Sequence, residues 1–373
     1  MNLGIDGNEA NVENRVGSGQ YTIEILRQFS KIRSNKVEVF LKEKPAEELP
    51  QENSNFTYKV FGPKKLWTQI ALPLRLVSNK KLNVFFSPAH YGPRFSRVPY
   101  VVTIHDLSYL HFPKLFNKDD LYQLKNWSKY SIEKSAHIIA VSKSTKEDIV
   151  KNYNVKADKV TVIYEGYDKR RFKKQTKEKI EKIKTRYKIK GDYIIFVGTL
   201  QPRKNVEKLM EAFNILIQNQ DPNVQNLSLV IAGKKGWLYD RIFKKANSLS
   251  IKNKIIFTDF VPDEDLPAIV SGAKVYVLPS LWEGFGIPVI EAQACGVPVV
   301  VSNGSSLPEI VGESGILVDP NSPNEVAAGI RKALEPENSQ NLVKAGLENI
   351  KRFSWENCAK ETLQVLEKAS RKK

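Results

Sequence analysis

Short runs of apolar residues alternate with helical patterns along most of the chain. In the first half the apolar runs are LGID, VEVFL, NVFFSP, YVVTIHD, IIAVS and VTVIYEG, and the periodic segment GQYTIEILRQFSKI lies between the first two. A second series begins with YIIFVGT and continues through LSLVIAG, IIFTDF, KVYVLPS and VPVVVS. Strands that alternate with helices predict βαβ units and parallel sheets, so we expect an α/β protein.

The alternation is interrupted once, by the charged and mostly helical segment DKRRFKKQTKEKIEKIKTRYKIKG. Because 373 residues exceed what one core usually supports, we predict a basic N-terminal domain over 1–168, a linker over 169–190 and a second domain over 191–352. The last segment, 353–373, predicts a helix with Ser354 as its N-cap, and this helix fits against either domain.

Composition and targeting signals restrict the class of protein. No apolar run approaches the roughly 20 residues needed to span a bilayer. The start MNLGIDGNEA has neither the basic nor the apolar region of a secretory signal. Two cysteines, Cys295 and Cys358, are too few for a disulfide framework and lack metal-ligand spacing. We therefore expect a cytoplasmic protein with reduced thiols and no structural zinc.

The net charge of +17 is unevenly distributed along the sequence. Residues 1–190 contain 37 basic and 20 acidic residues, whereas residues 191–373 contain 21 of each. This asymmetry indicates either a solvated basic face or an anionic partner, a membrane surface before nucleic acid. Residues 64–81, KKLWTQIALPLRLVSNKK, are consistent with a helix at the membrane surface and with a helix packed under the first domain.

The stretch PSLWEGFGIPVIEAQACGVPVV, residues 279–300, places Glu283 and Glu291 eight positions apart around a Gly-rich turn. Gly284 and Gly286 allow backbone amides to approach a ligand, and a helix N-terminus just behind them favours negative charge. Two carboxylates that accept hydrogen bonds from hydroxyls suit a hexose and a ribose, which indicates a nucleotide sugar. As an isolated pair, however, the glutamates favour an ordinary structural role, in which Glu291 caps the helix or pairs with a nearby lysine and Glu283 is solvated.

This stretch resembles the Glu-x7-Glu signature of the retaining glycosyltransferases of family 4. FVGTLQPRKNVEKLMEAF, DFVPDEDLPAIVSGAKVYVLPS and TVIYEGYDKRRF are similar to other segments of that family, and GSGQYT and VVTIHDLSYL occupy its usual positions in the first half. The resemblance covers nearly the whole chain and is most specific over 195–310. It implies the GT-B fold, in which two Rossmann-like domains face each other across a cleft.

The resemblance also implies roles for individual residues. Glu283 would contact the donor hexose and Glu291 the ribose. Arg203 and Lys204 would neutralise the diphosphate leaving group, and fixed cations lower the barrier where negative charge develops on a leaving oxygen. His105 would lie beside the sugar C6 and the reacting centre. The other expected donor contacts are Gly17, Gly19, Val261, Gly284, Phe285, Gly286 and Ile287.

For two of these expectations, the GSGQYT loop and Val261, the sequence itself limits what can be inferred, and one neighbouring residue, Asp106, has an expected role of its own. GSGQYT is not a dinucleotide fingerprint, because Thr22 replaces the third glycine, and the family uses this loop near the donor phosphates and acceptor. Asp106 is expected to orient the loop after the strand that ends near His105. Val261 lies where the family recognises the base through backbone groups, so the identity of the base is not visible in side chains.

We predict a metal-independent, retaining enzyme without a cofactor, because no carboxylate cluster or Asp-x-Asp motif indicates a divalent cation. It would transfer a hexosyl group, with mannosyl from GDP-mannose as the first choice, to a glycan or a polyprenyl-diphosphate-linked glycan. The setting would be surface polysaccharide assembly at the inner face of the cell membrane. A UDP- or dTDP-sugar donor, a nucleotide-sugar 2-epimerase of the same fold and a non-catalytic binder of anionic ligands remain alternatives. No nucleic-acid partner is expected.

Overall fold

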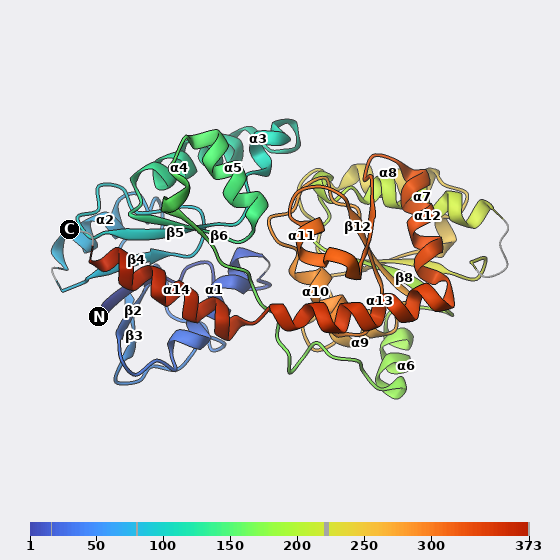
Figure 1. Ribbon diagram of the computed structural model, residues 1–373, viewed down its shortest axis with the longest axis horizontal. Helices are drawn as coiled ribbons and strands as arrows, with labels where there is room; N and C mark the ends of the chain where they lie inside the picture. The colour runs from blue at the N-terminus through green and yellow to red at the C-terminus, as the bar shows by residue number, and fades with distance from the viewer. Residues whose placement is uncertain (16, 80, 220–223, 372–373) are drawn as a thin grey trace. The chain divides into compact units, whose positions relative to one another are not determined.

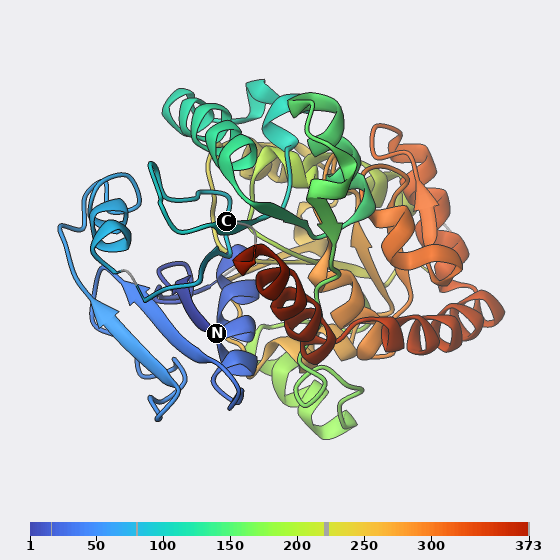
Figure 2. The same cartoon turned by 60° about the vertical axis from the view of Figure 1, so that its left-hand side comes forward.

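The computed structural model describes residues 1–15, 17–79, 81–219 and 224–371, and its chain forms two compact units (Figures 1 and 2). Unit 1 consists of Met1–Gly166 and Phe353–Lys373, and unit 2 of Tyr167–Arg352. The C-terminal segment is therefore part of the first unit. The segment 169–190, expected as a linker, is part of the second.

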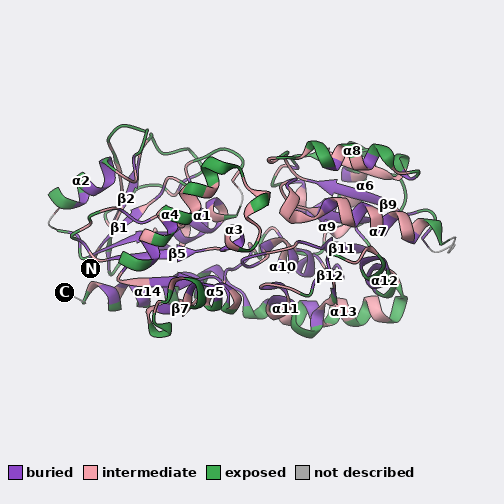
Figure 3. Ribbon diagram, turned by 90° about the horizontal axis from the view of Figure 1, so that it is seen from above, coloured by how far each residue is buried: buried purple, intermediate pink, exposed green. Residues whose placement is uncertain are grey.

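Unit 1 is built on a parallel sheet. In its described residues seven strands lie in the order β3-β2-β1-β4-β5-β6-β7, and every neighbouring pair is parallel. The strands β4 and β5 are buried along their whole length, as in sheets covered by helices on both faces, which explains their continuous apolar sequence (Figure 3). The strands are β1 (Asn2–Asp6), β2 (Lys36–Leu41), β3 (Phe56–Val60), β4 (Val84–Ser87), β5 (Tyr100–Ile104), β6 (His137–Ala140) and β7 (Val160–Val162).

The last helix closes the core of unit 1. It packs against the first helix and against β4, β5 and β6, and its Trp355 ring contacts Tyr21 at a centroid distance of 6.0 Å. Ser354 is its N-cap, since the side-chain oxygen accepts from the Asn357 amide at 3.2 Å, and the predicted cap is confirmed. The helices of unit 1 are α1 (Ser18–Phe29), α2 (Ala71–Ser78), α3 (Ser108–His111), α4 (Lys118–Lys134), α5 (Lys143–Tyr153) and α14 (Trp355–Ser370).

Unit 2 contains a second parallel sheet. Within the described ranges it has six strands in the order β10-β9-β8-β11-β12-β13. These are β8 (Tyr193–Val197), β9 (Ser228–Ala232), β10 (Ile255–Asp259), β11 (Val275–Leu278), β12 (Val299–Ser302) and β13 (Ile316–Val318). The helices are α6 (Lys177–Arg186), α7 (Val206–Gln218), α8 (Asp240–Ser248), α9 (Leu266–Ser271), α10 (Ile287–Ala294), α11 (Leu307–Val311), α12 (Pro323–Leu334) and α13 (Pro336–Asn349).

The predicted linker is attached to unit 2 by polar contacts as well as by packing. Helix α6 packs against α9, Arg186 pairs with Asp265 at 2.5 Å, and Arg171 pairs with Asp263 at 3.0 Å. This placement changes the distribution of charge, because unit 1 contains 30 basic and 20 acidic residues and unit 2 contains 28 and 21. The positive excess is therefore shared by both units and is not a property of the first alone.

Both sheets reverse their strand order at one point, between β1 and β4 in unit 1 and between β8 and β11 in unit 2. In open parallel sheets, ligands bind beyond the carboxyl ends of the strands at such a reversal. Each unit therefore has one place where a ligand site is expected. Separately, no helix of the described residues is long and apolar enough to cross a bilayer.

Candidate active site

In unit 2 the loops that follow β8 and β11 bring three predicted site residues together. Lys204 Nζ lies 2.6 Å from Glu283 Oε1, and Arg203 Nη1 lies 3.2 Å from Glu283 Oε2. The side chains of all three are largely buried, with exposed fractions between 8% and 13%. The two cations come from the short helical turn Pro202–Lys204, about 80 residues before the glutamate. This cluster stands at the strand reversal of the second sheet.

The electrostatics of the cluster keep Glu283 ionised. Burial alone would raise the pKa of this carboxyl, but the charges of Lys204 and Arg203 outweigh burial and lower the pKa below its ordinary value. One carboxylate between two cations leaves the cluster with a net positive charge. Such a cluster can accept hydrogen bonds from hydroxyls through the carboxylate and bind an anion through the two cations.

The backbone around Glu283 is held by residues that the sequence did not single out. The Glu283 amide donates to Ser305 Oγ at 2.9 Å, and Ser306 Oγ contacts the carbonyl oxygens of Glu283 and Phe285 at 2.9 and 3.1 Å. Asn205 fixes the other side of the cluster by donating to the carbonyl oxygen of Pro279 at 3.1 Å. The only sequence signal for the serines is the Gly-Ser-Ser turn that follows β12.

The second predicted glutamate lies on helix α10, which starts directly after the Gly-rich turn. Gly286 caps this helix with φ at 108°, a left-handed conformation that favours glycine. Glu291 lies about one turn into the helix and is half-buried. The helix contains a proline in its first turn and ends before Gly296 at φ 73°, as the sequence predicts. The first amides of α10 thus lie beside the turn, where a helix N-terminus attracts negative charge.

The phenol of Tyr276 in β11 is affected by the charges of both glutamates. Burial raises the pKa of its phenol well above the ordinary value, and the charges of Glu283 and Glu291 raise it further. The charges of both carboxylates therefore reach the Tyr276 phenol. The remaining predicted donor residues of unit 2 are also near strand ends: Val261 follows β10 and is buried, and Gly284, Phe285 and Ile287 form the turn and the start of α10.

In unit 1, His105 directly follows β5 and is nearly buried. Its Nδ1 lies 3.2 Å from Glu165 Oε1 and its Nε2 lies 2.9 Å from the carbonyl oxygen of Pro88. Both partners are acceptors, so a ring protonated on both nitrogens satisfies both contacts. Burial lowers the pKa of His105, but Glu165 and the Pro88 carbonyl outweigh burial and raise it. Sequence reasoning missed Glu165, which lies 60 positions away.

A Glu165→Gln variant tests this pair through the pH dependence of stability. The folded-state pKa of His105 lies above its ordinary value of about 6.5, so the pair stabilises fully below that pH and its contribution is lost as the pH rises. We expect the melting temperature of the wild type to fall from about pH 6.5 upward more steeply than that of the variant. Nuclear magnetic resonance titration of the His105 ring should show a lower pKa in the variant. Parallel melting curves and an unchanged titration would contradict the assignment.

The other residues of unit 1 that the sequence singled out shape the backbone at the starts of α1 and α3. Asp106 accepts from the Ser108 amide at 2.9 Å and so orients the first turn of α3. Gly17 precedes α1 with φ at 48°, and a Cβ on Gly19 would come within 2.7 Å of the Glu9 carbonyl oxygen. The glycines therefore let α1 start close to the loop after β1. Among the described residues, no group of three or more His, Cys, Asp or Glu side chains could hold a metal ion.

Two parallel-sheet units with the strand order of Rossmann-like domains, together with the Glu283 cluster, define an enzyme of the GT-B glycosyltransferase class. Residues 16–171 match the model of Glycosyltransferase Family 4, and residues 176–348 match that of Glycosyl transferases group 1. The chain belongs to glycosyltransferase family 4.

Individual proteins resemble the chain over most of its length. It is 28% identical to the O-antigen chain mannosyltransferase B of Escherichia coli, over 94% of this chain and 95% of the relative. It is 34% identical to an uncharacterized glycosyltransferase of Methanocaldococcus jannaschii, over 72% of this chain and 69% of the relative. The crystal structure of Anabaena HepE in complex with UDP and glucose has the same fold, with a TM-score of 0.76 and 18% identity over 98% of this chain and 99% of that protein.

Proposed function

We propose that this enzyme transfers a mannosyl group from GDP-mannose to a hydroxyl of a glycan, or of a glycan linked to a polyprenyl diphosphate, during assembly of a surface polysaccharide. The observation that carries the proposal is the cluster of Glu283 with Arg203 and Lys204 at the strand reversal of unit 2. In this proposal the carboxylate receives sugar hydroxyls, the two cations bind the diphosphate, and Glu291 binds the ribose. Similarity to an O-antigen mannosyltransferase over nearly the whole chain supports mannose and the polysaccharide setting.

The chemistry of the cluster is consistent with transfer that retains the anomeric configuration. The fixed cations would stabilise the leaving diphosphate as its bond to the sugar breaks, and one of its oxygens would receive the proton of the attacking hydroxyl. His105 would lie beside the sugar. Product analysis by nuclear magnetic resonance decides the stereochemistry, because retention gives an α-linked product from GDP-α-mannose.

The donor is tested by thermal stabilisation with GDP, UDP and dTDP and their sugars. A ligand at 100 times its dissociation constant adds about 2.7 kcal/mol to the free energy of unfolding. We expect GDP-mannose to raise the melting temperature of the wild type and Glu291→Ala to remove the shift. A larger rise in melting temperature with UDP or dTDP compounds would show that GDP-mannose is not the preferred donor. No rise with any of the nucleotides would overturn the donor site.

Turnover is expected to be independent of divalent cations. In this proposal Arg203 and Lys204, which both pair with Glu283, supply the positive charge that a metal would otherwise bring to the diphosphate. Full transfer activity in excess chelator is the expected result. Activity that disappears in chelator and returns with magnesium or manganese would contradict this expectation.

We also propose that unit 1 binds an anionic membrane surface through the segment that contains α2. Ile70, the N-cap of α2, and Leu74 and Val77 within the helix follow helical spacing, and their exposed fractions lie between 42% and 67%. The opposite face of α2, with Leu72 and Leu76, is buried in the core. Lys65, Arg75 and Lys81 supply the flanking positive charge. Exposed apolar residues among cations are typical of helices that lie in a bilayer interface.

The membrane proposal predicts the effect of a double substitution. Each buried apolar side chain contributes about 1.5–3 kcal/mol, so Ile70→Glu with Leu74→Glu should weaken binding to anionic vesicles by at least about 100-fold. Cosedimentation with phosphatidylglycerol vesicles at low salt measures this. Leu347→Glu, at a residue of α13 with a similar exposed fraction of 43%, is the matched control. Equal binding by the double variant, or no binding by the wild type, would contradict the proposal.

Two other activities are distinguished by the products. A 2-epimerase would convert the nucleotide sugar without an acceptor, and a non-catalytic binder would leave it intact. The proposed transferase consumes the donor in proportion to glycosylated acceptor, which chromatography of both products measures.

A further inference from the structure

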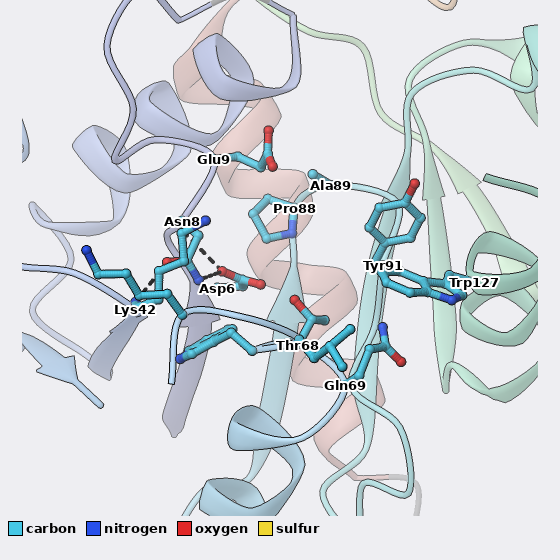
Figure 4. A pocket seen from close by; sticks show the side chains of 13 residues that line it. Asp6, Asn8, Glu9, Lys42, Thr68, Gln69, Pro88, Ala89, Tyr91 and Trp127 are labelled. Carbon is cyan, nitrogen blue, oxygen red and sulfur yellow. Dashed lines mark hydrogen bonds between the residues drawn. The ribbon is translucent and has the colours of Figure 1, made fainter. Parts of the chain in front are cut away.

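A cavity lies in unit 1 at the strand reversal between β1 and β4 (Figure 4). Its volume is about 210 Å³. Its lining comes from the end of β1 and the residues after it, Lys42 after β2, the segment 64–69, the loop after β4 and one side chain of α4. None of the predicted site residues lines this cavity.

One side of the cavity is aromatic. Tyr91 and Trp127 are half-buried, and their rings lie 5.5 Å apart and nearly perpendicular, at 77° (Figure 4). The residue before Tyr91, His90, has φ at 36°, and its amide donates to the Thr103 carbonyl at 3.0 Å. Strained backbone of this kind persists where the surrounding structure holds it and is concentrated at ligand sites. Because the backbone beside Tyr91 is held in this way, Tyr91 and Trp127 form a fixed apolar wall of the cavity.

Hydrogen-bond acceptors lie across from and below this wall (Figure 4). Asp6 Oδ1 accepts from the amide and the side chain of Asn8 at 3.0 and 2.7 Å. A carboxylate has about four acceptor positions on its two oxygens, so these two bonds leave Asp6 able to accept from a ligand as well. Gln69 Oε1 is buried and has no hydrogen-bond partner within the described chain. Because an unsatisfied buried acceptor is costly, a ligand that donates a hydrogen bond to Gln69 is favoured.

The charges around the cavity are balanced. Asp6 and Glu9 oppose Lys42 and Lys64, and Lys64 is paired with Glu43 at 3.0 Å. At neutral pH a phosphate group offers mostly acceptor oxygens, which do not match Asp6 or Gln69, and its negative charge is repelled by the carboxylates. A neutral ligand with several hydroxyls and one apolar face matches both walls. The ring of a sugar is such a ligand, because its C–H groups form an apolar face that packs on aromatic rings.

We propose that this cavity binds the terminal sugar ring of the acceptor glycan, with its apolar face on Tyr91 and Trp127 and its hydroxyls donating to Asp6 and Gln69. This assignment rests on the proposed function and specifies the acceptor as a neutral sugar end and not a lipid phosphate. The cavity is smaller than the ~300–1,000 Å³ of sites for drug-sized ligands. It therefore takes about one sugar unit.

The test uses saturation-transfer nuclear magnetic resonance on the full chain. The probes are methyl α-mannopyranoside, its gluco and galacto epimers, and inorganic phosphate as competitor. We expect at least one glycoside to bind the wild type and to bind Tyr91→Ala and Gln69→Leu at least about fivefold more weakly. Tyr122→Ala, an exposed tyrosine on the same helix as Trp127, is the matched control and should bind like the wild type. Circular dichroism confirms that each variant is folded.

The cavity proposal is overturned if no glycoside binds the wild type, if Tyr91→Ala binds as tightly as the wild type, or if phosphate displaces the glycoside. The nucleotide-stabilisation experiment on the same samples separates this failure from that of the proposed function. Stabilisation by a nucleotide sugar without glycoside binding removes the cavity assignment and leaves the transferase. Glycoside binding without stabilisation by any nucleotide sugar would remove the proposed transferase function and leave the cavity as a sugar-binding site.

Discussion

Lys204→Ala is expected to lower kcat by about 10²–10³-fold, with only a small effect on the folded structure. Removing one fixed donor that faces developing negative charge costs about this much in other enzymes. The side chain is 13% exposed and lies 2.6 Å from Glu283, so no other cation can take its place easily. Glu283 keeps Arg203 at 3.2 Å in the variant, which limits the structural cost. Initial rates at saturating donor and acceptor give the result.

Lys208→Ala is the matched control for this variant. Lys208 lies one turn further along, at the start of α7, and pairs with Glu211 at 2.8 Å while 41% exposed. Exposed pairs of this kind contribute little, so we expect kcat within about twofold of the wild type. If Lys204→Ala retained kcat within the same range as the control, the electrostatic role of the cluster in the reaction would have to be abandoned.

Gly233→Ala is expected to destabilise unit 2 by about 3 kcal/mol or more. Gly233 directly follows β9 with φ at 153°, and an added Cβ would overlap the carbonyl oxygen of Gly198. Its amide also donates to the Asp259 carbonyl at 2.9 Å, so the backbone is held between β8 and β10 and cannot move aside. Backbone strain and overpacking each cost about 1–3 kcal/mol. For a unit of this size the melting temperature should fall by about 6–12 °C, as thermal denaturation would show.

Gly304→Ala provides the comparison at a glycine without these constraints. An added Cβ there meets no heavy atom within 4 Å, and its φ is not in the left-handed region. We expect the free energy of unfolding to change by less than about 0.5 kcal/mol. Equal melting temperatures for the two variants would show that the strand ends around Gly233 can move and are not rigid.

The alternation of apolar and helical patterns was sufficient to predict the central strands of both sheets and two of the edge strands, β7 and β10. The other two edge strands, β3 and β13, were not predicted. Both are edge strands with one neighbour each, β13 has only three residues, and Leu317 within it is 42% exposed. Edge strands need not be apolar on both faces, so the continuous apolar run that identifies β5 or β8 is missing from them.

The helix in 169–190 was expected, whereas its attachment to unit 2 was not. Ile183 is its one buried side chain among many charges, and ion pairs such as Arg186 with Asp265 hold the segment in place. A charged composition typical of a linker therefore conceals a packed element. Counting charges along the sequence assigned this segment to the first half, which is why the positive excess is less uneven between the two units than between the two halves of the sequence.

The central cluster of the candidate site could be anticipated because Arg203, Lys204 and Glu283 lie in loops after strands of one parallel sheet. Such loops meet at the same edge. The partner of His105 could not be anticipated, because Glu165 lies 60 positions away in a segment without a motif. Tyr91, Trp127 and Gln69 come from three separate elements and have no common spacing, so only the folded chain brings them to one cavity.

The pairing of Glu283 with both cations has a consequence for how the enzyme distinguishes its substrate from its product. The carboxylate acts as an internal counter-ion to Arg203 and Lys204. Under the proposed function, a nucleoside diphosphate without a sugar must compete with Glu283 for these two cations. A nucleotide sugar brings hydroxyls that offer the displaced carboxylate new hydrogen bonds, whereas the spent nucleotide does not. Under the proposed function, departure of the sugar therefore allows Glu283 to return to the cations and promotes release of the nucleotide.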